Sequence, residues 1–235
     1  MASGNKKIQT QVGSQEVSDF LDKLARTPAV RSSEGVGRLM FAMDATASRE
    51  PSWDSACHIQ GEMFKATDGL GGLEVQLVFF RGFGECKNSS WLSSSDELVR
   101  RMTSVYCRGG RTQIGKVLNH AVGETKKRKV NALVYVGDAM EEEVDDLCHI
   151  AGELGVLGVP IFVFQEGDDP VATQAFRQFA NLTGGAHCRF DASSANQLKE
   201  LLAAVAVFAA GGLPALEDYG KRAGAAVAQL TSQVK

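Results

Sequence analysis

Residues 37–48, with the sequence GRLMFAMDATAS, form the stretch around which the rest of the chain is arranged. Five consecutive apolar residues, 39–43, are too few for a helix and do not alternate with polar ones, so they predict a strand buried on both faces. The strand ends in three oxygen-bearing side chains at alternate positions, Asp44, Thr46 and Ser48. A helix start is predicted directly afterwards. The question for the remaining sequence is whether it supplies partners for these oxygens.

The 235 residues are 44% hydrophobic and 23% charged, with a formal net charge of −3. These values are those of an average globular protein and indicate neither a disordered chain nor a membrane bundle. The charge balance gives no electrostatic reason to expect binding to nucleic acid or to an anionic membrane. The longest apolar run, 201–210, is half of the roughly 20 residues that cross a bilayer. The N-terminal residues contain no apolar segment typical of a secretory signal, so we expect a soluble, cytoplasmic protein.

Apolar runs and helical periodicity alternate along the chain and predict a single α/β domain. We expect strands over 39–43, 73–81, 85–92, 131–137, 160–165 and 187–190. We expect helices over 13–27, 52–67, 141–157, 171–182 and 194–210, and two more that begin at Ser95 and Thr112. The predicted fold is a doubly wound, mostly parallel central sheet with helices on both faces. Its one antiparallel edge strand is 85–92, where the polar tract 87–90 suits an exposed edge.

Three regions follow from this order of elements. Residues 1–34 form a leader that contains the first helix, and residues 35–210 form the α/β domain. Residues 211–235 form a tail that begins at Gly211-Gly212 and whose alanine-rich pattern leaves open whether it adds a helix or frays.

Polar side chains follow the predicted strands at the edge where open α/β sheets carry their functional crevice. Asp44, Thr46 and Ser48 follow the first strand, Thr112 follows the pair Gly109-Gly110 before a helix, and Asp138 ends the strand at 131–137. All of them carry hydroxyl or carboxylate oxygens. We expect them to meet at one edge of the sheet.

This combination of D-x-[ST]-x-S, G-G-x-T about 60 residues later and an aspartate ending a buried strand resembles the von Willebrand factor A (VWA) domain. The resemblance covers roughly residues 35–210 and implies a VWA-like, Rossmann-like fold. It also implies a metal-ion-dependent adhesion site (MIDAS), matched residue by residue at Asp44, Thr46, Ser48, Thr112 and Asp138. Hard, small Mg²⁺ prefers such oxygen ligands, and Mn²⁺ is the alternative.

The resemblance also carries an expected role. It implies a metal-dependent protein-binding module, in which the cation receives an acidic side chain from a partner protein. Some stand-alone bacterial VWA proteins accompany stress-response or chaperone-associated systems, which is the expected setting. The partner, the oligomeric state and the choice of metal are left open.

Two sequence features near the proposed ligands have more than one interpretation. Gly137-Asp138-Ala139 stands where many relatives have T-D-G, and Glu141 to Glu143 follow it. These glutamates fit the first turn of a helix, where negative charge is favoured, and a second hypothesis is that one reaches the metal and competes with a partner. Arg49 and Arg111, each beside a presumed ligand, would either steer an acidic partner or be solvated.

A second resemblance, to the haloacid dehalogenase-like phosphotransferases, gives an alternative function. It rests on Asp44 as a nucleophile at a strand end, the basic run 126–129, and Gly137-Asp138. Most phosphatases of that family place an acid/base aspartate where this chain has Thr46, and Thr112 has no role in this alternative. No nucleotide loop, nucleophile elbow or zinc-protease motif is present. We therefore predict that the protein is not an enzyme.

Three remaining features do not indicate a specific function. Five scattered cysteines, odd in number and without a C-x-x-C pair, predict reduced thiols rather than disulfides or a zinc site. The run 126–129 fits a solvated helix end that complements the helix dipole. Trp91, on the expected edge hairpin, is either an exposed interface aromatic or a packed one.

Overall fold

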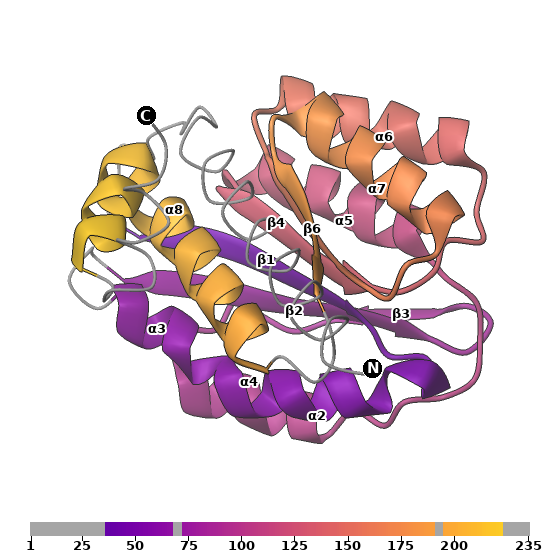
Figure 1. Cartoon of the computed structure of the whole chain (residues 1–235), viewed down its shortest axis with the longest axis horizontal. Helices are drawn as coiled ribbons and strands as arrows, with labels where there is room; N and C mark the ends of the chain where they lie inside the picture. The colour runs from indigo at the N-terminus through magenta and orange to yellow at the C-terminus, as the bar shows by residue number, and fades with distance from the viewer. Residues whose placement is uncertain (1–35, 68–71, 191–194, 223–235) are drawn as a thin grey trace, which may run out of the picture.

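The computed structural model describes residues 36–67, 72–190 and 195–222, and these form a twisted sheet between two layers of helices (Figure 1). The sheet contains six strands in the order β3-β2-β1-β4-β5-β6. The predicted leader helix at 13–27 lies outside the described residues.

Strand β1 (Gly37–Asp44) is buried along its whole length, as its uninterrupted apolar run predicts. Leu39, Phe41 and Met43 pack into the core on one face of the sheet. Met40 and Ala42 pack into the core on the other face. A strand with apolar side chains on both sides has to lie between two helical layers, and this requirement places β1 in the middle of the sheet.

The strand pairings confirm the predicted fold class. Strand β1 is parallel both to β2 (Leu73–Arg81) and to β4 (Ala132–Gly137). On the far side of β4, the parallel strands β5 (Ile161–Glu166) and β6 (Ala186–Phe190) continue the sheet. Strand β3 (Glu85–Asn88) is the one described strand that pairs antiparallel, and it does so at the edge beside β2.

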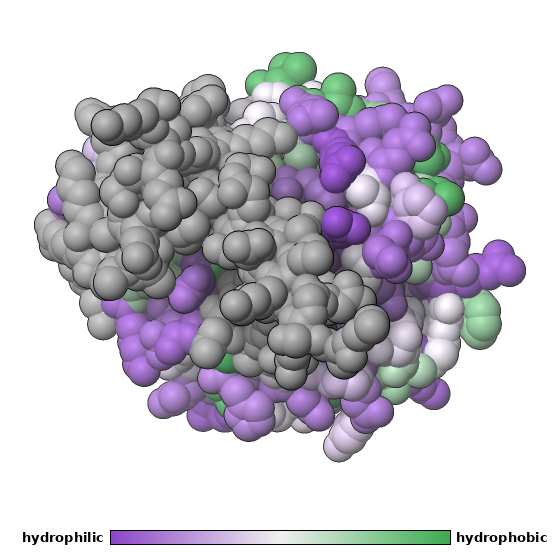
Figure 2. Space-filling model, viewed as in Figure 1, coloured by the Kyte–Doolittle hydropathy of each residue, from purple (hydrophilic) through white to green (hydrophobic). Residues whose placement is uncertain are grey.

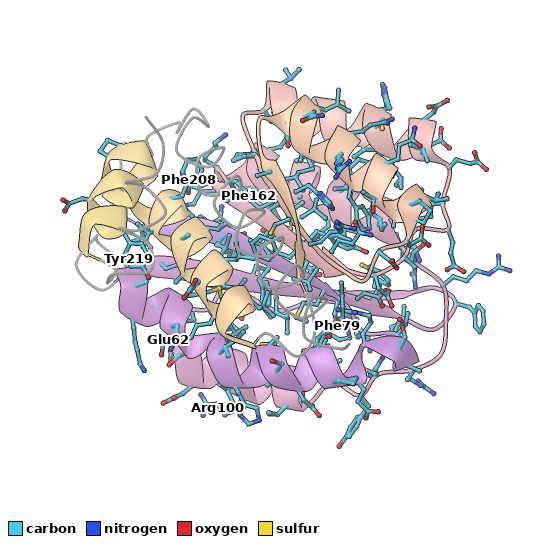
Figure 3. All side chains as sticks on the ribbon, in the orientation of Figure 1. Glu62, Phe79, Arg100, Phe162, Phe208 and Tyr219 are labelled. Atoms are coloured by element: carbon cyan, nitrogen blue, oxygen red, sulfur yellow. The ribbon has the colours of Figure 1, made fainter. Side chains whose placement is uncertain are left out.

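Among the described residues, four α-helices cover one face of the sheet and three cover the other; Figure 1 shows the two layers. The first layer comprises α2 (Glu50–Ile59), α3 (Gly61–Thr67), α4 (Ser95–Thr103) and α8 (Ala195–Arg222). The second comprises α5 (Ile114–Lys127), α6 (Val144–Val156) and α7 (Pro170–Thr183). The Phe208 ring of α8 lies 5.6 Å from the Phe162 ring of β5, edge to face, which fixes α8 against the sheet (Figure 3).

Three predicted boundaries are corrected by the structure. The helix expected over 52–67 begins at Glu50 and is divided at Gln60 into α2 and α3. The antiparallel edge strand ends at Asn88, and Leu92 then pairs with Val75 through an isolated bridge. The helix expected from Glu141 begins three residues later, at Val144, because the preceding glutamates bind another helix.

Helix α8 extends past residue 210, where the domain was expected to end, and continues to Arg222. Gly212 interrupts it with a left-handed φ of 70°, which a glycine adopts without strain. Beyond this kink, Ala215 and Tyr219 pack against the core on the α8 face, and Tyr219 is seen beside the kinked end in Figure 3. The first part of the predicted tail is therefore helical, and residues 223–235 lie outside the described residues.

Within the described ranges, none of the helices combines the length and the apolar character needed to span a membrane.

Candidate functional site

The site lies where β1 and β4, neighbours in the sheet, reach their carboxyl ends. Met43 pairs with Val136 in the parallel register, so Asp44 and the residues after Gly137 leave the sheet side by side. The chain after β1 runs into α2 on one face, and the chain after β4 runs into α6 on the other. In doubly wound sheets, the point where the connections diverge in this way is the usual position of a binding site. In Figure 1 this edge is on the right, where α2 begins.

Hydrogen bonds connect four of the five predicted site residues. Asp44 Oδ1 accepts a bond of 2.7 Å from the backbone N–H of Thr46, which fixes the turn after β1. The hydroxyl oxygens of Thr46 and Ser48 lie 3.4 Å apart. Ser48 Oγ donates to Asp138 Oδ2 over 3.1 Å, and this bond joins two motifs 90 residues apart in the sequence. The structure thus brings the first and third motifs together.

Asp44 is the buried member of this group, with 1% of its surface exposed. Burial raises the pKa of the Asp44 carboxyl to about 6, the hydrogen bonds from Thr46 lower it, and the nearby Asp138 charge raises it. A buried carboxylate beside a second carboxylate is costly unless positive charge compensates for it. The turn therefore presents hydroxyl groups outward and holds negative charge behind them.

Thr112 reaches the site through the loop after β4 rather than through a hydrogen bond to Ser48. Its hydroxyl accepts a bond of 3.0 Å from the backbone N–H of Glu141, and its own N–H donates to Glu141 Oε2 over 2.9 Å. This reciprocal pair ties the start of α5 to the loop that carries Asp138. The segment of Thr112 is also held near β1 because Arg108 N donates to the carbonyl of Ala45 over 3.0 Å.

The glutamates after Asp138 were expected in the first turn of the following helix. In the structure they precede α6, which begins at Val144. Glu142 accepts hydrogen bonds from the N–H groups of Ile114 (2.5 Å) and Gly115 (2.9 Å), at the beginning of α5. The free N–H groups and dipole of a helix N-terminus favour such a carboxylate. Glu141 and Glu142 together form a cap on α5, and the first turn of α6 takes its negative charge from Asp145 and Asp146 instead.

Gly137 stands where many VWA domains have the threonine of T-D-G, and the packing of Tyr135 gives a steric reason for this difference. A Cβ atom on Gly137 would lie 2.6 Å from the hydroxyl oxygen of Tyr135. Tyr135 is a core residue, and burial raises the pKa of its phenol well above the usual value, so the group stays neutral. A threonine at 137 would require this ring to move.

Arg49 differs from both sequence interpretations, since it is neither solvated nor exposed to a partner. Only 1% of its surface is exposed, and its guanidinium forms an ion pair with Glu166. Its Nη1 also lies 3.9 Å from Asp138 Oδ2. Ser52 donates a second hydrogen bond to Glu166. Arg111, by contrast, is exposed.

Glu166 is a site residue that the sequence interpretation missed. It follows the strand predicted at 160–165 directly, next to the carboxyl end of β4, so the rule that selected Asp44 and Asp138 would also have selected it. The burial of Arg49, however, has no counterpart in the sequence pattern, because it depends on how α2 packs against the sheet.

The donor set fits a hard divalent cation. The outward groups are hydroxyl and carboxylate oxygens, without the thiolate or imidazole ligands that favour softer metals. The site contains three carboxyl groups, those of Asp44, Asp138 and Glu166, and one guanidinium, that of Arg49. Its net charge is therefore negative. Among the described residues, no group of three or more His, Cys, Asp or Glu side chains is arranged for a metal; the five residues that match the MIDAS motif contain only two carboxylates.

The basic run that supported the phosphotransferase alternative lies at the opposite edge of the sheet. Lys129 donates to the carbonyls of Leu157 and Gly158, which precede β5. Lys126 and Lys127 pair with Glu153 and Glu124. A lysine that assists an Asp44 nucleophile would have to lie near the carboxyl end of β1, so this run does not serve that chemistry.

The comparisons with known proteins agree with this architecture. No protein-family model matches the chain. No curated protein matches its sequence. Among solved structures, the VWA domain of SpRpn10 is 17% identical, covers 72% of this chain and 94% of its own, and gives a TM-score of 0.56. An aerotolerance-related membrane protein from Bacteroides fragilis is 18% identical, with coverages of 71% and 96% and a TM-score of 0.53.

A third match includes a metal site. Proximal thread matrix protein 1 from the mussel byssus, solved with a zinc-occupied MIDAS motif, is 16% identical and gives a TM-score of 0.57. The match covers 74% of this chain and 48% of the byssus protein, so the two share one domain. The described part of this chain therefore has a VWA-like fold.

Proposed function

We propose that the protein is a metal-dependent protein-interaction module. In this proposal, Mg²⁺ or Mn²⁺ would be held at the carboxyl ends of β1 and β4 by Ser48, Thr46 and Thr112, with Asp44 and Asp138 behind them. The bound cation would supply an electrophilic coordination position for an acidic side chain of the partner. Hydroxyl ligands leave more of the charge of the cation for that carboxylate than a set of carboxylates would.

The observation that carries the proposal is the hydrogen bond from Ser48 Oγ to Asp138 Oδ2. It shows that two polar groups from separate motifs converge on one point, which a simple helix cap at Ser48 would not require. The described 3-10 turn at Ala47–Arg49 also has no side-chain capping bond from Thr46. The Ser48 hydroxyl is thus directed to Asp138 and lies beside the hydroxyl of Thr46.

Each residue of the site would have a distinct role in holding the cation. Asp44, fixed by the N–H of Thr46, orients the turn and provides negative charge from a buried position. Asp138 orients the Ser48 hydroxyl, and the Glu141 backbone orients that of Thr112. Arg49 neutralises Glu166 and part of the Asp138 charge, which keeps the site from becoming a cluster of uncompensated carboxylates.

The partner and the setting belong to the proposal as well. The partner is a protein with an acidic side chain, and a stress-response or chaperone-associated role follows from the resemblance. The similarity to an aerotolerance-related membrane protein supports the stress-response setting. We also propose that the module is not catalytic, because Asp44 is enclosed and no basic residue of the 126–129 run reaches it.

Metal binding is tested by calorimetric titration with Mg²⁺ and Mn²⁺, together with thermal denaturation in the presence of each ion. Native protein should bind one ion and gain stability, and Ser48→Ala and Asp138→Asn should lose both responses. Equal responses in native and variant proteins would contradict the assignment. The non-catalytic proposal is tested on a panel of phosphoesters: hydrolysis by the native protein that disappears in Asp44→Asn would overturn it.

A further inference from the structure

Two aromatic side chains project from the molecule near the candidate site without packing against the core. Phe83 is 85% exposed and Tyr106 is 76% exposed. Phe83 occupies the tip of the β2–β3 hairpin between two glycines, a position that folding alone would fill with a polar residue. Exposed aromatics are characteristic of protein-binding surfaces, where they act as anchors.

Hydrogen bonds to backbone carbonyls hold the segments of these two aromatics together. Arg111 N donates to the carbonyl of Gly82 over 3.1 Å, and Arg81 Nη1 donates to the carbonyl of Tyr106 over 2.7 Å. Gly110 packs so closely on Gly82 that a Cβ atom there would collide with its backbone. The hairpin tip and the segment before α5 therefore form one fixed surface.

That surface borders the candidate metal site. Ala45, next to Asp44, donates to the carbonyl of Phe80 over 2.9 Å and accepts from Arg108 N over 3.0 Å. Thr112, a predicted ligand, belongs to the same segment as Tyr106. On the right-hand side of Figure 2, where Figure 1 places the hairpin, pale green hydrophobic groups project beside purple hydrophilic ones.

Two exposed arginines add positive charge to this surface. Arg108 and Arg111 lie on either side of Gly109-Gly110, and no carboxylate of the described residues forms an ion pair with either of them. Their neighbour Arg81, by contrast, pairs with Glu85 over 2.9 Å. We call Phe83, Tyr106, Arg108 and Arg111 the rim.

We propose that the rim is the docking surface for an acidic segment of the partner protein that also carries an apolar side chain. This inference rests on the proposed function for one contact, the carboxylate at the metal. Further acidic residues of the segment pair with Arg108 and Arg111, and its apolar residue packs on Phe83 and Tyr106.

The test uses fluorescence anisotropy of three labelled peptides with the native chain in Mg²⁺. The first peptide combines aspartate and glutamate with leucine and tryptophan. The second replaces the acidic residues with their amides, and the third replaces the apolar residues with serine. We expect binding of the first and at least about tenfold weaker binding of the other two, as for the loss of an interface hot spot. Failure of the native chain to bind the first peptide overturns the proposal.

Two double variants locate the binding surface. Phe83→Ser with Tyr106→Ser, and Arg108→Gln with Arg111→Gln, should each weaken binding of the first peptide about tenfold or more. The matched controls are Val156→Ser, an apolar residue 91% exposed at the end of α6, and Arg100→Gln on α4, which Figure 3 shows away from the hairpin edge. Equal loss in the controls, or no loss in the rim variants, contradicts the rim.

Mg²⁺ titration of the same variants separates this inference from the proposed function. All rim variants should bind Mg²⁺ like the native chain, since none of the four residues is a proposed ligand. Peptide binding that depends on the rim but is unchanged by chelator would support the rim and overturn the metal-dependent function. Peptide binding that depends on Ser48 and Mg²⁺ but not on the rim would support the metal-dependent function and overturn the rim. Peptide-independent self-association through the rim, seen by light scattering and lost in both double variants, would also overturn the partner assignment.

Discussion

Ser48 Oγ donates a hydrogen bond of 3.1 Å to Asp138 Oδ2 and so joins the ends of β1 and β4. The two residues follow strands that are neighbours in the sheet, although four α-helices and two strands lie between β1 and β4 in the sequence. Because Ser48 is exposed while Asp44 behind it is buried, the bond lies at the boundary between the core and solvent.

Replacing Ser48 with alanine should separate metal binding from folding. The side chain is exposed, so the unfolding free energy without metal should change by less than about 0.5 kcal/mol. The rise in melting temperature caused by Mg²⁺ should disappear because a direct ligand is lost. Thermal denaturation with and without Mg²⁺ measures both effects, and the exposed Ser93→Ala serves as the matched control. A Mg²⁺ response in Ser48→Ala equal to the native one would be incompatible with this role.

Arg49→Met should destabilise the fold by about 3 kcal/mol, since it leaves the partly buried Glu166 without its ion-pair partner. The same change should tighten binding of Mg²⁺, because Asp138 would no longer share its charge with the guanidinium. Urea denaturation and calorimetry measure the two effects. The exposed Arg100→Gln should change neither. Weaker Mg²⁺ binding in a folded Arg49→Met protein would show that the arginine supports the site rather than competing with the cation.

Glu142→Ala should lower the unfolding free energy by about 1 kcal/mol, because two N–H groups at the start of α5 lose their acceptor. Glu143→Ala is the matched control, since this exposed neighbour makes no side-chain capping bond to α6. Denaturation in urea compares the pair directly. If both variants unfold at the same urea concentration as the native chain, the cap contributes nothing measurable to stability.

Gly110→Ala should destabilise the protein by about 1–3 kcal/mol, because the added methyl group collides with the backbone of Gly82. Gly109→Ala should cost less than about 1 kcal/mol, since its Cβ would meet no atom within 4 Å. The comparison also tests the rim, because Gly110→Ala alone should weaken binding of the acidic peptide. Unfolding free energies that are equal in the two variants would show that the segments are not in close contact.

Much of the fold was predictable from local patterns. The run of apolar residues in β1 has side chains for two cores, and the alternation ending in an apolar run at Leu73–Arg81 matches the observed strand end to end. Such patterns predict strands well because the burial of each residue depends mainly on the polarity of its own side chain. Boundaries set by hydrogen bonds to distant segments were less accurate: the start of α6 was misplaced because Glu141 and Glu142 serve α5 instead.

The candidate site, like the fold, was predictable from the sequence only in part. Asp44, Thr46, Ser48, Thr112 and Asp138 could be selected from the sequence, because polar residues at the carboxyl ends of buried strands gather at one edge of the sheet. The sequence also determined that their donors are oxygens. Only the tertiary structure decided that Arg49 is enclosed against Glu166, that Glu141 holds Thr112, and that Phe83 and Tyr106 project beside the site. These facts depend on which segments pack together across long sequence separations, and a local pattern of residue types carries no information about that packing.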